Sequence, residues 1–177
     1  MGGKIRFNVA KFGAKVASQV SKFGFGSGNN LPGYVFYKIA GKEALKDLAH
    51  EMSIGPILIT GTNGKTTTTT LLIKLLSADT KIRKSFESNT IHAITTGILK
   101  GDGDLGVFEY GIRNKSYGIP DTVQRLIDPV GVVYTTISRE HSQVAGVKNP
   151  FEEYVDAKSL LSQGMTRGVV ISNADDP

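Results

Sequence analysis

The stretch that decides the fold reads Ile57-Leu58-Ile59-Thr60-Gly61-Thr62-Asn63-Gly64-Lys65-Thr66-Thr67. It begins as an apolar run typical of a buried strand, continues as a Gly-containing turn, and opens a segment with apolar residues at helical spacing over 71–76. A strand, a loop and a helix in this order direct backbone N–H groups and a helix N-terminus toward one point, which makes a cradle for an anion. In such a loop Lys65 would reach the terminal phosphates of a nucleotide, and the Thr66 hydroxyl would reach a Mg²⁺ ion.

The loop departs from the strict phosphate-loop pattern G-x-x-x-x-G-K-(S/T), because position 59 is Ile rather than Gly. The alternative interpretation is a Gly-rich turn that only caps a Thr-rich helix. The order Gly64-Lys65-Thr66 between a strand and a helix favours nucleotide binding.

Apolar and polar segments alternate through the remainder of the chain. Strands are predicted over residues 104–110, 131–137 and 168–172, and helices over residues 42–51, 90–100, 121–127 and 151–161. Residues 81–88 are polar and basic and are assigned no element. The pattern predicts an α/β fold of the P-loop type, with a mostly parallel sheet flanked by helices. Ligands bind at the carboxyl ends of the strands in such sheets.

Chain length, composition and charge limit the classes of protein to which this sequence can belong. The 177 residues are enough for one domain with its own core, and the absence of Cys fits a reducing compartment. No apolar run approaches the ~20 residues of a membrane span, and no secretory signal is visible. The net charge is +5, but residues 1–42 hold seven basic residues and no acidic one, which leaves −2 for the remainder. We expect a cytoplasmic protein with no nucleic-acid partner.

The basic N-terminal part, residues 1–40, is predicted to be a helix and a Gly-rich linker ahead of an ATP-binding domain over 41–177. Residues 4–23 have one apolar stripe, with lysines off it; the stripe consists of Ile5, Val9, Phe12, Val16, Val20 and Phe23. Such a helix packs on its own or another domain, the more common case, or lies on an anionic membrane surface. Residues 24–33 are expected to form a flexible linker.

The segment Gly61–Thr67 resembles the phosphate loop of the Mur ligase family, the ATP-dependent enzymes that build cell-wall peptides. Thr66-Thr67 after the Lys favours this family over the related folylpolyglutamate synthases. Leu31-Pro32-Gly33 resembles the N-terminus of the MurT-like branch, and Asn173-Ala174-Asp175-Asp176-Pro177 is a further family marker. The resemblance covers about residues 31–177 and implies the central ATPase domain, truncated on its C-terminal side.

The resemblance implies a set of site residues with ATP and Mg²⁺ as cofactors. The nucleotide would be bound by Gly61, Thr62, Asn63, Gly64, Lys65, Thr66 and Thr67. The metal ligands would be Thr66, Glu109, His141 and Lys158, and the residues assigned to catalysis are Lys65, Glu109, His141 and Lys158.

Each metal ligand has an ordinary alternative. Glu109 follows a predicted strand and would otherwise be a solvated strand-end acid. His141 stands in Glu140-His141, where the family usually has Asp-His, and would otherwise be a surface residue. In the family a Lys at the position of Lys158 takes up CO₂ as a carbamate; otherwise Lys158 would be a helix-surface lysine.

The implied function is an ATP-dependent amide-forming or peptide-forming ligase of cell-wall precursor synthesis, working through an acyl phosphate. Its partners would be a cell-wall peptide precursor and an amino acid or ammonia. Only 60 residues precede Gly61, and a His is present at 141, so a pseudomurein-type peptide ligase is favoured. The alternatives are a MurT-like amidating subunit that works with a glutaminase, a half that needs a C-terminal partner chain, and a nucleotide-binding fragment without catalysis of its own.

Overall fold

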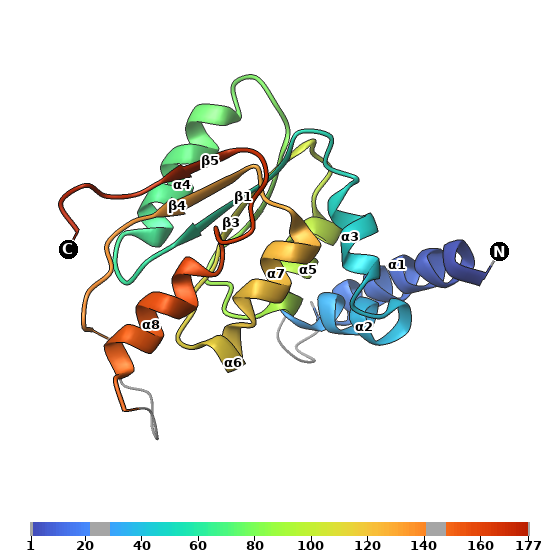
Figure 1. Ribbon diagram of the computed structural model, residues 1–177. Helices are drawn as coiled ribbons and strands as arrows, with labels where there is room; N and C mark the ends of the chain where they lie inside the picture. Colours follow the sequence, from blue (N-terminus) through green and yellow to red (C-terminus); the bar gives the residue numbers. More distant parts are fainter. Residues whose placement is uncertain (1, 22–28, 141–147, 177) are drawn as a thin grey trace.

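One parallel sheet organises the chain, as the computed structural model shows for residues 2–21, 29–140 and 148–176 (Figure 1). The strands lie in the order β2-β3-β1-β4-β5, and all four neighbouring pairs are parallel. Their bounds are β1 Gly55–Thr60, β2 Ile82–Ser85, β3 Leu105–Glu109, β4 Gly131–Tyr134 and β5 Val169–Ile171. The predicted α/β fold with a parallel sheet is therefore confirmed.

Helices cover both faces of the sheet (Figure 1). One face carries α4 (Lys65–Leu76), and the other carries α3 (Ala44–Ala49), α5 (Ile91–Lys100), α7 (Pro120–Ile127) and α8 (Pro150–Ser159), with the short α6 (Lys115–Gly118) beside α8. Neighbouring residues of β1 serve the two cores: Leu58 packs in the larger core with α5 and α7, and Ile59 packs with Ile73 of α4. Burial on both faces explains the continuous apolar run of β1.

The predicted elements are present in the structure, but three observed elements were not predicted: the edge strand β2, the helix α2 and the short helix α6. Residues 82–85 form the edge strand β2, which the polar sequence Ile82-Arg83-Lys84-Ser85 did not indicate. The predicted linker ends earlier than expected, because Leu31–Ala40 form the helix α2 with Pro32 in its first turn. Residues 24–28 of that linker, and Phe23 of the predicted apolar stripe, lie outside the described residues.

The N-terminal helix α1 (Gly2–Ser21) packs against α2, on the side of α5 away from the sheet (Figure 1). Its inward face combines three small residues with one aromatic ring: Ala10, Ala14 and Ala17 are buried, and the half-buried Phe7 meets the Phe36 ring edge-on at 5.5 Å. A Cβ built on Gly13 would lie 3.1 Å from Ile39 Cδ1 of α2, so the two helices approach closely. The large apolar stripe faces outward, with Phe12 70% exposed. Helix α1 does pack on its own domain, which was the favoured expectation, but the stripe of Ile5, Val9, Phe12, Val16 and Val20 does not make this contact.

In the part of the chain that the structure describes, no helix is both long and apolar enough to cross a bilayer.

Helix α2 is fixed to α5 through a close backbone contact at Gly33. The Gly33 N–H donates to the Thr96 hydroxyl at 2.9 Å, and a Cβ at this position would lie 2.0 Å from the carbonyl oxygen of His92. The His92 ring meets Tyr34 and Tyr37 edge-on at 5.4 and 4.9 Å. Burial, with the nearby Lys38 as a smaller cause, lowers the pKa of His92 and favours the neutral ring at this contact.

We expect Gly33→Ala to lower the free energy of unfolding by about 1–3 kcal/mol, because the added methyl group must displace backbone of α5. Gly3→Ala is the matched control: it lies in α1 with nothing within 4 Å of its Cβ position. The control should change stability little or raise it slightly. Equal denaturation midpoints for the two variants would contradict the close contact.

Candidate nucleotide site

The loop between β1 and α4 has the backbone of an anion cradle. Gly64 caps α4 in the left-handed region, with φ +85°, and Gly61 has φ +148°. A Cβ on Gly61 would lie 2.0 Å from the Thr135 hydroxyl oxygen, so both conformation and space call for glycine there. The first N–H groups of α4 have no partners within the helix, and they point to the side where this loop lies.

Residues after β4 hold the loop in place. The Thr62 N–H donates to the Thr136 carbonyl at 2.5 Å, and the Thr135 hydroxyl donates to the Asn63 carbonyl at 2.6 Å. The Ser138 N–H donates to the Thr62 hydroxyl at 2.9 Å. Each bond joins residues more than seventy positions apart, so the loop geometry depends on β4 as much as on its own sequence.

The Thr66 hydroxyl and the Glu109 carboxylate meet beside the loop. Thr66 Oγ1 donates to Glu109 Oε2 at 2.8 Å, and Glu109 is 4% exposed at the end of β3. Lys65 Nζ lies across the loop and donates to the Thr62 carbonyl at 2.8 Å. A hydroxyl and a carboxylate are hard oxygen donors of the kind that Mg²⁺ prefers beside a phosphate, so these two residues fit the expected metal. Among the described residues no group of three or more His, Asp or Glu gathers at one point.

Lys158 of α8 is fully buried, which excludes the alternative of a surface lysine. Its Nζ donates to the Ile112 carbonyl at 2.8 Å and to the Gly61 carbonyl at 3.3 Å, and it lies 4.2 Å from the centre of the Tyr154 ring. Burial, and secondly the charge of Lys65, lower the pKa of Lys158 to about 7. A substantial share of this side chain is then a neutral amine near neutral pH.

No role was predicted from the sequence for two residues near the site: Tyr154, which was not singled out, and Asp176, which was quoted only as part of a family marker. Tyr154 shares a hydrogen bond of 3.0 Å with the Thr62 hydroxyl, and burial raises its pKa. Tyr154 precedes Lys158 by four residues, and this spacing on one helix face is a signal that could have located it. Asp176 accepts a hydrogen bond of 2.5 Å from the Ile137 N–H and so ties the segment after β5 to the segment after β4. That contact has no signal in a single sequence.

The structure ties the remaining predicted site residues less firmly to the site. His141 lies outside the described residues, so the structure does not place the expected second metal ligand. Its neighbour Glu140 accepts a hydrogen bond of 2.9 Å from the Asn63 side chain. Thr67 is exposed in the first turn of α4.

An open cavity of about 530 Å³ adjoins the loop. It extends from Gly64 and Thr68 of the loop region across β4 to Asn173, after β5. The cavity lies at the carboxyl ends of the strands, where ligands bind in open parallel sheets.

The Mur ligase middle domain matches this sequence over residues 59–177. The chain belongs to the Mur ligase family. It is 30% identical over 142 residues to the UDP-N-acetylmuramoyl-tripeptide--D-alanyl-D-alanine ligase of Bacillus subtilis, covering 76% of this chain and 30% of that protein. It is 36% identical over 100 residues to the ligase of the same name from Borreliella burgdorferi, covering 54% of this chain and 21% of that protein.

Solved structures show the same fold. MurF from Acinetobacter baumannii superposes with a TM-score of 0.61 at 18% identity, covering 80% of this chain and 29% of that one. MurF from Thermotoga maritima, solved in complex with ADP, superposes with a TM-score of 0.62 at 18% identity, covering 77% of this chain and 33% of that one. The chain thus spans about a third or less of the relatives it matches. These matches confirm that the chain belongs to the Mur ligase family. That it belongs to the pseudomurein-type or the MurT-like branch stays a prediction.

The lowered pKa of Lys158 predicts a pH dependence of stability. Its folded pKa of about 7 lies below the ordinary value of 10.5, so the unfolded chain binds more protons between these two values. The free energy of unfolding therefore rises with pH in this window, and below it the full cost of burying the ammonium is present. Relative to Lys158→Met, wild type should gain about 1–3 kcal/mol between about pH 7 and about pH 9 in CO₂-free buffer. If the free energies of unfolding of wild type and Lys158→Met changed equally with pH, the lowered pKa of Lys158 would be contradicted.

Proposed function

We propose that this chain is the ATP-binding part of a ligase that forms an amide or peptide bond in cell-wall precursor synthesis. The observation that carries the proposal is the contact of the Thr66 hydroxyl with the buried Glu109 carboxylate, beside a glycine loop at a helix N-terminus. This pairs a phosphate cradle with hard oxygen ligands for Mg²⁺. Family membership and the ADP complex of the Thermotoga maritima relative support ATP as the nucleotide.

In this proposal different residues of the loop bind different parts of the nucleotide. Backbone N–H groups over 61–67 and the start of α4 would bind the phosphates, and Lys65 would leave the Thr62 carbonyl for the terminal phosphates. Thr66 and Glu109 would hold Mg²⁺, which supplies charge stabilisation for the transferring phosphoryl group when it is bound. The nucleoside would extend into the cavity toward Asn173.

Lys158 suits the carbamate role that the family implies. Its neutral amine nitrogen would attack the carbon of CO₂, form a C–N bond and lose one proton, which leaves an anionic carbamate. Because Lys158 Nζ lies beside the carbonyls of Gly61 and Ile112, the carbamate oxygens would lie next to the phosphate loop. With His141 they would form a second set of oxygen and nitrogen ligands for a metal.

In the proposed reaction a substrate carboxylate takes the terminal phosphoryl group of ATP to give an acyl phosphate. An amine then attacks the acyl carbon, and phosphate leaves as the amide forms. The names of the bacterial relatives support a cell-wall peptide precursor as the acceptor. Within this class a pseudomurein-type ligase that joins an amino acid and a MurT-like amidating subunit with a glutaminase both stay as predictions.

The test of nucleotide binding is Lys65→Ala, with Lys74→Ala on the exposed side of the same helix as the control. Loss of a charge-assisted contact to phosphate should weaken binding of ATP-Mg by about ten-fold or more in calorimetry. The control should bind like wild type. Equal affinity of Lys65→Ala and wild type would remove the loop from the nucleotide site.

The second candidate is a nucleotide-binding chain without catalysis of its own, and the observation that favours it is that the cavity beside the loop is open rather than enclosed. We expect the 177-residue chain alone to show at most slow ATP hydrolysis and no amide product, because its cleft is open to water. Mass spectrometry of mixtures with ATP, amino acids and a precursor peptide would test this. Robust amide formation would show that these residues suffice for ligation.

A further inference from the structure

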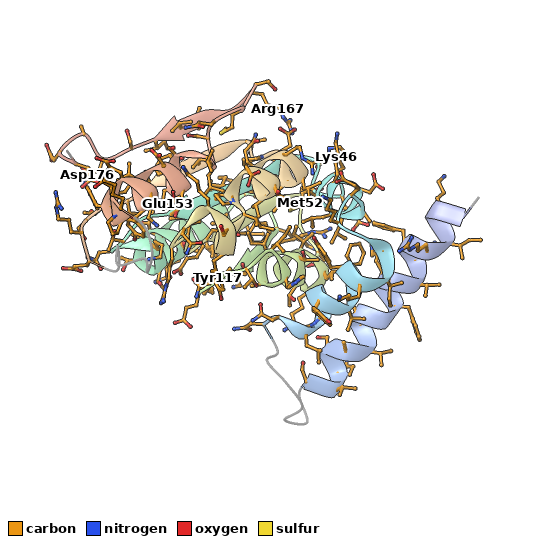
Figure 2. All side chains as sticks on the ribbon, turned by 60° about the horizontal axis from the view of Figure 1, so that its bottom comes forward. Lys46, Met52, Tyr117, Glu153, Arg167 and Asp176 are labelled. Carbon is orange, nitrogen blue, oxygen red and sulfur yellow. The ribbon has the colours of Figure 1, made fainter. Side chains whose placement is uncertain are left out.

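Helix α1 presents a second face that neither the core nor the nucleotide site uses. Five large apolar residues recur along it at steps of four, three, four and four, and all are exposed: Ile5 65%, Val9 52%, Phe12 70%, Val16 47% and Val20 42%. This spacing aligns them in one stripe along the helix. Figure 2 shows α1 at the margin of the molecule, with side chains projecting away from the other elements.

The stripe is not a by-product of packing α1 on the protein. The inward face is made of Ala10, Ala14, Ala17 and one aromatic ring, Phe7, with Gly13 in close contact with α2. In a surface helix of a globular protein the large apolar residues face inward and polar residues face solvent. Here one large apolar residue faces inward and five face solvent, so the stripe fits a contact beyond the described residues.

The charge of α1 selects the kind of partner. The helix holds four basic residues, Lys4, Arg6, Lys11 and Lys15, and no acidic one. Lys4, Lys11 and Lys15 share one face that borders the stripe, because each immediately precedes one of its apolar residues. Of these, Lys11 is paired with Glu51 at 2.7 Å, and Lys4 and Lys15 are exposed.

A groove continues this basic edge toward α5. It has a volume of about 790 Å³, and Phe12 of the stripe lines it together with three lysines, Lys11, Lys15 and Lys100. No acidic residue belongs to the described lining. Apolar and cationic groups therefore meet at Phe12, as acyl chains and anionic headgroups meet at a bilayer surface.

We propose that α1 docks this protein on an anionic membrane surface, with the stripe at the acyl boundary and the lysines at lipid phosphates. A second copy of the chain fits less well, because it would bring four more cations and no acid to the same contact. The placement leaves the nucleotide site accessible: α1 and the carboxyl ends of the strands lie at opposite ends of the molecule (Figures 1 and 2). The proposal does not depend on the proposed ligase activity.

The experiment is co-flotation of the 177-residue protein with vesicles of phosphatidylcholine alone or with added phosphatidylglycerol, without nucleotide. Wild type should bind the anionic vesicles and bind the neutral ones far less. Lys4→Gln/Lys15→Gln should weaken binding to anionic vesicles by roughly thirty-fold, following the loss of two surface cations. Phe12→Ser/Val16→Ser should weaken it by about ten-fold or more through lost apolar burial.

Matched controls lie on other helices. Leu71→Ser/Leu75→Ser replaces two leucines of α4 that are 55% and 71% exposed, and Lys46→Gln/Lys74→Gln removes two exposed lysines. Both controls should float like wild type, and all variants should keep the wild-type melting temperature because every change is at an exposed position.

Three results would overturn the proposal. The first is absence of vesicle binding at every lipid composition, and the second is vesicle binding that the α1 variants and the control variants reduce equally. The third is a concentration-dependent dimer in sedimentation velocity that Phe12→Ser/Val16→Ser abolishes, which would assign the face to a second copy. The α1 variants should bind ATP as tightly as wild type. Loss of vesicle binding in these variants would then be independent of nucleotide binding by the loop.

Discussion

The site depends on one buried amine. Lys158 reaches from α8 to the carbonyl of Ile112, after β3, and to the carbonyl of Gly61, in the phosphate loop. These two hydrogen bonds join three segments that are far apart in sequence. Burial of a full ammonium is unfavourable, and Lys65 nearby adds repulsion, so the position favours the neutral amine or an anionic derivative of it. The fold thus holds a nucleophilic nitrogen where a metal and phosphates are expected, and it uses the helix that carries Tyr154 to do so.

The neighbouring strands explain why the phosphate loop departs from the strict sequence pattern. Ile59 stands where the strict pattern has Gly, and it is a fully buried strand residue paired with Glu109 in register. The turn therefore starts only at Gly61, where the Thr135 hydroxyl fills the space that a Cβ would need. Hydrogen bonds from residues after β4 supply the rigidity of the loop. A change in the loop pattern is compatible with an anion cradle because its shape is set by a neighbouring strand.

The sequence predicted the parts of the fold that rest on local patterns. Strands β1 and β3 are mostly buried, β4 is half buried, and all three read as apolar runs, whereas the edge strand β2 has no fully buried residue and reads as polar. The loop and Glu109 were predicted from motif and order, but the burial of Lys158 was not, because no local pattern distinguishes a buried lysine from an exposed one. The contacts of Thr135 and Asp176 join distant segments and leave no trace in a single sequence.

Helix α1 shows what the spacing of apolar residues can predict about a helix and what it cannot. An apolar stripe indicates that a helix has two unlike faces, but it does not say which face meets the protein. The small residues Ala10, Ala14 and Ala17 form that contact because they let the backbone of α1 approach α2 closely. The large residues are then left for water or for a partner, and leaving them in water forgoes roughly 25 cal/mol for each Å² of apolar surface that a partner could cover. A helix that turns five large apolar residues outward and only Phe7 inward, and that carries basic residues without acidic ones, is better explained by an external anionic surface than by the stability of this domain.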